Sequence, residues 1–328
     1  MSNSSSGTGA SSAHPVHDQH LLVRRITVFL VPIYSVISLA FYVVVLVALG
    51  RIKERPSFYT LCISQGVADV LMLCLNLVSF TLPRSIGLYL QYNRLFINGW
   101  IGLYFYAYYV QITAVIVIAL NRLSAVRKPI EYTQAWSDKR LKNVLIIQWA
   151  WPLFWLVVFA IPSNQASDLQ ILEYGFSGVH GLASNSEHVL IADFMIQVFV
   201  TVPAVLVIYV TAVCLLARHH RAQKKQLISQ SAGQPSTTGS KIAWKEASSN
   251  SQLHRYKIEA RLTMIGLVLA STYVVIVVDI LINHLYHGHY ESNTVHLVKE
   301  LTTVFGFLLN ASLAPYILLL FSTTTREA

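Results

Sequence analysis

Long apolar segments alternate with polar or basic stretches along most of the chain. A helix needs about 20 residues to cross the hydrocarbon core of a bilayer, and seven segments reach that length. We therefore expect membrane-spanning helices over residues 27–50, 58–82, 99–122, 143–162, 189–216, 260–284 and 296–320. The pattern predicts an all-α membrane protein that folds as a seven-transmembrane helix bundle.

The overall composition agrees with this expectation. Hydrophobic residues make up 54% of the 328 residues, and charged residues make up only 12%. Such a chain is too apolar for a single soluble globular domain of this size. The predicted spans account for the excess of apolar residues.

The basic residues lie mainly on one side of the predicted bundle. Nineteen of the 24 lysine and arginine residues fall at the ends of the first, third and fifth helices, in the loops that follow them, or in the C-terminal tail. Because positively charged loops remain in the cytoplasm, we expect the N-terminus outside and the C-terminus inside. The asymmetry also explains the net charge of +9 without a nucleic-acid partner.

Polar segments flank and interrupt the predicted bundle of residues 27–320. Residues 1–26 should form a disordered extracellular tail without a cleaved signal peptide, and residues 321–328 a short cytoplasmic tail. Asn3 begins an Asn-Ser-Ser triplet, which is a glycosylation acceptor in an exposed segment. The inner loop 217–258 is rich in Ser, Thr, Gly and Gln after a basic start. We expect it to be largely disordered, with helical extensions at both ends.

Asp69 is the clearest ionisable residue inside a predicted span. It lies about 11 residues, or about 16 Å, from the inner end of its helix, and Gln65 and Asn76 share its helix face. Ionisable groups within a membrane usually face the bundle interior. Two interpretations remain open: a polar cluster that joins helices, or a cation or proton site whose occupancy changes between conformations.

The third predicted helix carries a stripe that links its two ends. Arg122 follows the charge-free apolar run 99–120. Tyr104 precedes Arg122 by 18 residues, which is about five helical turns. If this face points inward, the outer half lines a cavity and the base presents Arg122 to cytoplasmic partners. An interfacial aromatic belt is the alternative; it suits Trp100 better than Gln111. The stripe contains Trp100, Tyr104, Tyr108, Gln111, Val115, Ile118 and Arg122.

Polar residues also occur in the outer halves of the later predicted helices. Carboxylates on three different helices favour an acidic, partly wet pocket for a cationic or hydrogen-bond-donating ligand. The alternative is that these carboxylates are rim residues in headgroup water. Together with Tyr104, Tyr108 and Gln111, the candidate ligand-binding residues are Asp193, Gln197, Thr201, Asp279, Glu300 and Thr303.

The chain carries no sequence signature of an enzyme or of a metal site. HExxH, phosphate-binding loop, GxGxxG and nucleophile-elbow patterns do not occur in it. A histidine run around 284–296 is more typical of a solvated loop than of a metal centre, which needs fixed geometry. We therefore predict a protein that is not an enzyme and that has no catalytic residues and no metal centre.

Several short stretches resemble rhodopsin-like G-protein-coupled receptors. Gly66–Leu71 reads Gly-Val-Ala-Asp-Val-Leu and is similar to that family's second-helix motif, while Asn121–Leu123 is similar to its Asp-Arg-Tyr triplet with an amide in place of the acid. Asn310–Tyr316 is a looser counterpart of its Asn-Pro-x-x-Tyr signature. Departures are a sixth helix without the tryptophan–proline pair, a third helix without the outer cysteine, and a tail too short for an eighth helix.

A narrower resemblance is carried by the base of the third helix and the loop after it. Leu120–Val126, followed by Pro129, Tyr132 and Trp136, is similar to nematode serpentine chemoreceptors. Among these, the stretch looks most like the Srg superfamily, which includes the gamma and V classes.

The resemblance implies a function and a set of partners. A small molecule would bind between the outer halves of helices 3, 5, 6 and 7, and outward movement of helix 6 would expose Arg122 to a heterotrimeric G protein. Asp69 would match the family's sodium-binding aspartate, so a Na⁺ ion beside it is the one cofactor implied. Asn121, Asn310 and Tyr316 would belong to the switch, and the receptor would sit among plasma-membrane lipids, in a sensory cell or cilium.

Two functions from other classes remain open on the residues alone. A secondary transporter would use Asp69 as a coupling carboxylate, and a ligand-gated channel of the seven-helix insect type would need the N-terminus inside, against the charge asymmetry.

Within the receptor class, Asn121 cannot form the ionic contact that an aspartate would make with Arg122. We therefore expect the inactive state to be less strongly stabilised and the receptor to show some signalling without ligand.

Overall fold

The computed structural model describes residues 15–52, 57–78, 94–160 and 195–232, and seven residues between 263 and 274. These parts of the chain are helical apart from short connections, and no strand occurs within them. We call the seven residues near 263–274 the sixth-span segment. The elements are α1 (Pro15–Arg51), α2 (Ser57–Asn76), α4 (Arg94–Arg127), α5 (Tyr132–Ala135), α6 (Asp138–Ala150), the 3₁₀ turn η2 (Trp151–Leu153), α7 (Phe154–Ala160), the π-helical turn η5 (Gln197–Thr201) and α9 (Val202–Ala232).

Five helical stretches in the described residues are long and apolar enough to cross a membrane. They are Pro32–Arg51, Ser57–Asn76, Gly102–Arg127, Asp138–Val158 and Phe199–His219. These stretches match the first five predicted spans. The sixth predicted span is described only through the sixth-span segment, and the seventh lies outside the described residues.

The first helix begins earlier than the sequence pattern predicts. α1 starts at Pro15, whereas the bundle was expected to begin at 27 after a disordered tail. The apolar part of the helix still begins at Pro32. The difference arises because hydrophobic length marks only the lipid-facing part of a helix, and a hydrogen-bonded backbone can continue beyond it.

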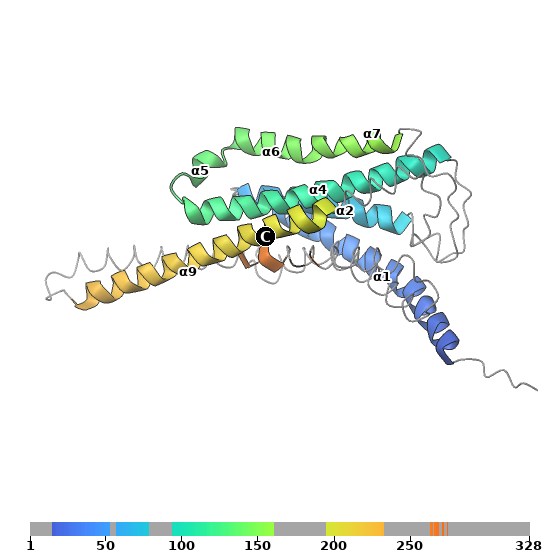
Figure 1. The fold of residues 1–328 in the computed structure, drawn as a ribbon, viewed down its shortest axis with the longest axis horizontal. Coiled ribbons are helices and arrows are strands. Elements are labelled where there is room, and N and C mark those ends of the chain that lie inside the picture. The colour runs from blue at the N-terminus through green and yellow to red at the C-terminus, as the bar shows by residue number, and fades with distance from the viewer. Residues whose placement is uncertain are drawn as a thin grey trace, which may run out of the picture.

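The central helix of the described bundle is α4 (Figure 1), which packs against α2, α6, α7 and α9, while α1 packs against α2. Large apolar side chains also cover the outside of these helices. Val44 and Val207 are each 64% exposed and Val157 is 62% exposed. Such an apolar exterior is expected where lipid replaces water as the solvent. It therefore agrees with a membrane location.

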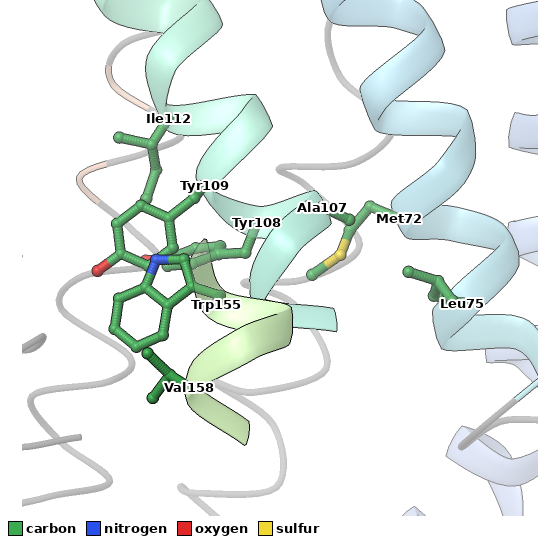
Figure 2. Close-up of a cluster of buried hydrophobic side chains, with 8 residues drawn as sticks. All are labelled: Met72, Leu75, Ala107, Tyr108, Tyr109, Ile112, Trp155 and Val158. Carbon is green, nitrogen blue, oxygen red and sulfur yellow. The ribbon is translucent and has the colours of Figure 1, made fainter. Parts of the chain in front are cut away.

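One cluster of buried side chains is largely aromatic and lies between α4 and α7. The Trp155 indole stacks on the ring of Tyr109, with centroids 4.7 Å apart, and on the ring of Phe105 at 5.6 Å. Figure 2 shows the Trp155 indole against the Tyr109 ring, with Met72 and Leu75 approaching from α2. Pro152 lies in the 3₁₀ turn that joins α6 to α7, since proline lacks the N–H that a continuous α-helix requires. This packing fixes the position of α4.

Candidate functional site

Arg122 is buried at the end of α4. Its side chain is only 2% exposed, and its guanidinium carbon lies 4.0 Å from the centroid of the Phe58 ring of α2. A cation over an aromatic face is stabilised by the quadrupole of the ring. In this conformation α2 and the segment after α4 cover the guanidinium, and its exposure to a cytoplasmic partner after helix movement stays a prediction.

A closed set of hydrogen bonds surrounds the guanidinium. Asn121 Nδ2 donates to Ser57 Oγ at 3.0 Å, Ser57 Oγ lies 2.6 Å from Tyr132 Oη, and Tyr132 Oη donates to Asn121 Oδ1 at 3.1 Å. Arg122 Nη2 donates to the same Asn121 oxygen at 2.7 Å. If Ser57 donates to Tyr132, both hydroxyls donate one hydrogen bond and accept another. Hydrogen bonds in such a chain strengthen one another. We call Ser57, Asn121, Arg122 and Tyr132 the arginine ring.

The short helix α5 is held in place by two side chains one turn apart. Tyr132 joins the arginine ring, and the Trp136 indole N–H donates to Ser124 Oγ of α4 at 2.6 Å. Residues four apart on a helix lie on the same face, so both side chains point toward α4. This loop therefore closes over Arg122 as a fixed element.

The role of Asn121 differs from the expectation in one respect. The amide forms no ionic pair, as predicted, but it does accept a short hydrogen bond from Arg122. It also donates to Ser57, which an ionised aspartate cannot do. The guanidinium is therefore held in a charge-assisted hydrogen bond by an uncharged amide that contributes both a donor and an acceptor to the network.

A second polar cluster surrounds Asp69, which is 1% exposed. Tyr42 Oη of α1 donates to Oδ2 at 2.6 Å, while the Nε2 atoms of Gln65 and Gln111 donate to Oδ1 at 2.7 and 2.6 Å. The cluster joins α1, α2 and α4 through one carboxylate. Buried charges persist only where hydrogen bonds or counter-charges compensate them. We call Asp69, Tyr42, Gln65 and Gln111 the aspartate cluster.

The close packing of α1 on α2 brings Tyr42 to Asp69. A β-carbon added at Gly66 would lie 2.8 Å from Leu46 Cδ2 and 3.7 Å from Tyr42 Cε1. The glycine leaves room for the tip of the Leu46 side chain at this close approach. The Gly-Val-Ala-Asp stretch thus lies against the part of α1 that carries the Tyr42 donor.

The aspartate cluster also carries the chemistry that a sodium ion needs. Gln65 Oε1 and Gln111 Oε1 are buried and have no hydrogen-bond partner within the described part of the chain. Carboxylate, amide and hydroxyl oxygens are suitable ligands for hard cations. A half-turn of either amide would exchange its nitrogen for its oxygen, so the residues present fit a cation beside Asp69.

The candidate ligand-binding residues that the structure describes lie on α4 and on the turn before α9. Tyr104 is half-buried and Tyr108 is buried in the aromatic cluster, whereas Gln111 belongs to the aspartate cluster. Gln197 and Thr201 are both buried at the two ends of η5. The remaining candidates, Asp193, Asp279, Glu300, Thr303, Asn310, Tyr316 and the glycosylation candidate Asn3, lie outside the described residues.

Comparisons with known proteins agree with this arrangement. The model of the serpentine type 7TM GPCR chemoreceptor Srv family matches residues 31–328. The chain belongs to this family. The Srv chain is also 32% identical over 125 residues to the Caenorhabditis elegans protein "Serpentine receptor class V-1"; the matched region spans 37% of this chain and 40% of that relative.

The fold of this Srv chain is that of rhodopsin. The crystal structure of squid rhodopsin superposes with a TM-score of 0.69 at 14% sequence identity, over 93% of this chain and 79% of the other. The predicted seven-transmembrane fold class and the resemblance to nematode serpentine chemoreceptors are thereby confirmed. The protein is a multi-pass membrane protein, and its family and fold are those of G-protein-coupled receptors, not of enzymes.

Sequence reasoning missed several residues of this Srv site. Tyr42 binds Asp69, Ser57 binds Asn121, and the Phe58 ring lies under the Arg122 guanidinium. None of these three residues carries a charge that would mark it in the sequence. Tyr132 was noted only as part of the family resemblance. One signal for these residues was present in the sequence: Tyr42 has a polar hydroxyl and lies inside an apolar predicted span.

Proposed function

We propose that this Srv chain is a chemosensory receptor of the plasma membrane that binds a small extracellular molecule and activates a heterotrimeric G protein. The observation that supports this most strongly is the buried Arg122, which donates hydrogen bonds to the uncharged side chains of Asn121 and Tyr132 at the end of the bundle rich in basic residues. Hydrogen bonds that involve a charged group contribute about 1.5–3 kcal/mol each. A conformational energy of a few kcal/mol is therefore enough to release the guanidinium.

The proposed ligand site lies at the opposite end of α4, with the N-terminus outside the cell. Tyr104 and Tyr108 on α4 and Gln197 and Thr201 beside η5 would contribute to it. Asp193, Asp279, Glu300 and Thr303 are proposed to complete it. A ligand shifts the receptor only if it binds one arrangement of the helices better than the other. Outward movement of the sixth helix is the proposed change, with Asn310 and Tyr316 as part of the switch.

Replacing Asn121 with aspartate tests the proposed inactive state. The carboxylate would turn the contact with Arg122 into an ion pair and would still accept from the Tyr132 hydroxyl, which accepts in turn from Ser57; a hydrogen bond becomes stronger when its acceptor is ionised. We expect basal signalling to fall by about fivefold, the factor expected for about 1 kcal/mol. The measurement is ligand-free nucleotide exchange on the G protein, normalised to receptor at the cell surface. Asn121→Ala serves as the opposite control and should raise the signal; equal output of wild type and Asn121→Asp would contradict the account.

We further propose that Na⁺ binds in the aspartate cluster and stabilises the inactive arrangement. Asp69 with the oxygens of Gln65, Gln111 and Tyr42 would hold it. A ligand that binds only the folded state raises thermal stability, so purified receptor should melt at a higher temperature in sodium chloride than in choline chloride. Asp69→Asn should remove that difference. The same melting temperature of the wild type in both salts would show that no sodium ion binds.

A further inference from the structure

The sixth-span segment approaches α9 at a residue that has no side chain. A β-carbon built on Gly266 would overlap Tyr209 Oη and lie 2.8 Å from Tyr209 Cε1 and 3.0 Å from Cζ. Contacts this short do not occur between real β-carbons and their neighbours. The ring of Tyr209 thus occupies the space that any other residue at position 266 would fill.

Tyr209 cannot move aside without disturbing the core. Its side chain is 1% exposed and packs in one cluster with Ala119 of α4 and Val205 of α9, with Leu267 against them. Tightly packed interiors respond to added volume by shifting backbone, because no free space is present. Movement of the sixth-span segment away from α9 would relieve the overlap.

The contact lies close to the arginine ring. Ala119 precedes Arg122 by three residues, so both lie on nearby positions of the same face of α4. Thr263, one turn before Gly266, is 1% exposed. The sixth-span segment therefore packs against α9, beside the part of α4 that carries Ala119 and Arg122.

We propose that Gly266 is a socket for the Tyr209 ring and that this fit latches the sixth helix in the closed position. This proposal depends on the proposed function in one respect: it takes outward movement of the sixth helix as the activating step. A side chain at position 266 pushes the helix outward, and removal of the Tyr209 ring abolishes that push. The latch is a steric device, independent of the hydrogen bonds of the arginine ring.

The first test is Gly266→Ala in the full-length receptor. We expect ligand-free nucleotide exchange on the G protein to rise about five- to tenfold, as expected from overpacking by one methyl group. Two glycines serve as matched controls. A β-carbon at Gly50 or at Gly99 would meet nothing within 4 Å. Neither control should raise the exchange rate, and a rise in either control equal to that of Gly266→Ala would overturn the proposal.

The second test separates the socket from general destabilisation. Residues in direct contact give non-additive effects in a double-mutant cycle, so Gly266→Ala should have no effect on exchange in the Tyr209→Leu background. If Gly266→Ala alone fails to reach the membrane, Tyr209→Leu should restore it. Equal effects in the two backgrounds, or no restoration, would contradict the socket.

A distance measurement distinguishes failure of the latch from failure of the proposed function. Spin labels on cysteines introduced at Arg140 and Met264, both exposed, report the separation of the sixth helix from α6. Cys74 and Cys214 are replaced by serine. Gly266→Ala should lengthen the distance relative to the unsubstituted label pair, whether or not any G protein responds. An unchanged distance would overturn the latch even if the receptor signals.

Discussion

Replacing Asp69 with alanine should leave little folded receptor at the cell surface. The change removes the acceptor of three buried hydrogen bonds and leaves the donors of Tyr42, Gln65 and Gln111 without it. A buried polar group that loses its partner costs about 1–3 kcal/mol, and because the three donors share one acceptor their costs are not independent, so we expect a total loss of about that size. Because the cluster joins α1, α2 and α4, the loss affects packing of three helices at once.

The measurement is surface expression together with the melting temperature of purified receptor. Asp69→Asn is the matched control, since it keeps the shape and one acceptor oxygen and should lie between wild type and Asp69→Ala. If Asp69→Ala matched the wild type in both properties, the cluster would have no structural role. If the two substitutions were equally damaging, the negative charge, and not the hydrogen bonds, would be the property that matters.

Replacing Tyr132 with phenylalanine should raise ligand-independent signalling by about tenfold. The hydroxyl donates to Asn121 Oδ1, lies 2.6 Å from Ser57 Oγ and accepts from Arg122 Nη2 at 3.4 Å. Loss of two good neutral hydrogen bonds shifts the balance by about 1–3 kcal/mol, and 1.4 kcal/mol corresponds to a factor of about ten. The ring of Tyr132 remains, so packing of α5 should change little.

Tyr106→Phe provides the control for removing a tyrosine hydroxyl elsewhere on the central helix. Tyr106 is half-buried and its ring lies 6.5 Å from Trp149, away from the arginine ring. This variant should keep the basal exchange rate of the wild type. A similar increase in both variants would mean that hydroxyl loss acts through general loosening of the bundle.

The sequence alone was sufficient for the five spans that the structure describes along their length, because hydrophobic length is a local property. Asp69 and Arg122 were also recognisable, since a charge beside or within an apolar run is rare and costly. The extension of α1 to Pro15 was not predictable from hydrophobicity, because helix continuation outside lipid depends on the backbone.

The partners of these charges could not be predicted, because they depend on tertiary packing. Tyr42 reaches Asp69 where α1 packs closely on α2 beside Gly66. Ser57 and Tyr132 lie 75 residues apart in the chain and meet only after α5 folds back on α4. The same holds for the fit of Gly266 on Tyr209, which has no counterpart in local sequence pattern.

The central claim is that release of Arg122 from the arginine ring activates a G protein. Nucleotide exchange in membranes holding Tyr132→Phe, compared with membranes holding Tyr132→Phe and Arg122→Ala together, tests it without any ligand. With equal amounts of receptor at the membrane, we predict a raised rate in the single variant and only the receptor-free rate in the double variant. A double variant as active as the single one would contradict the account.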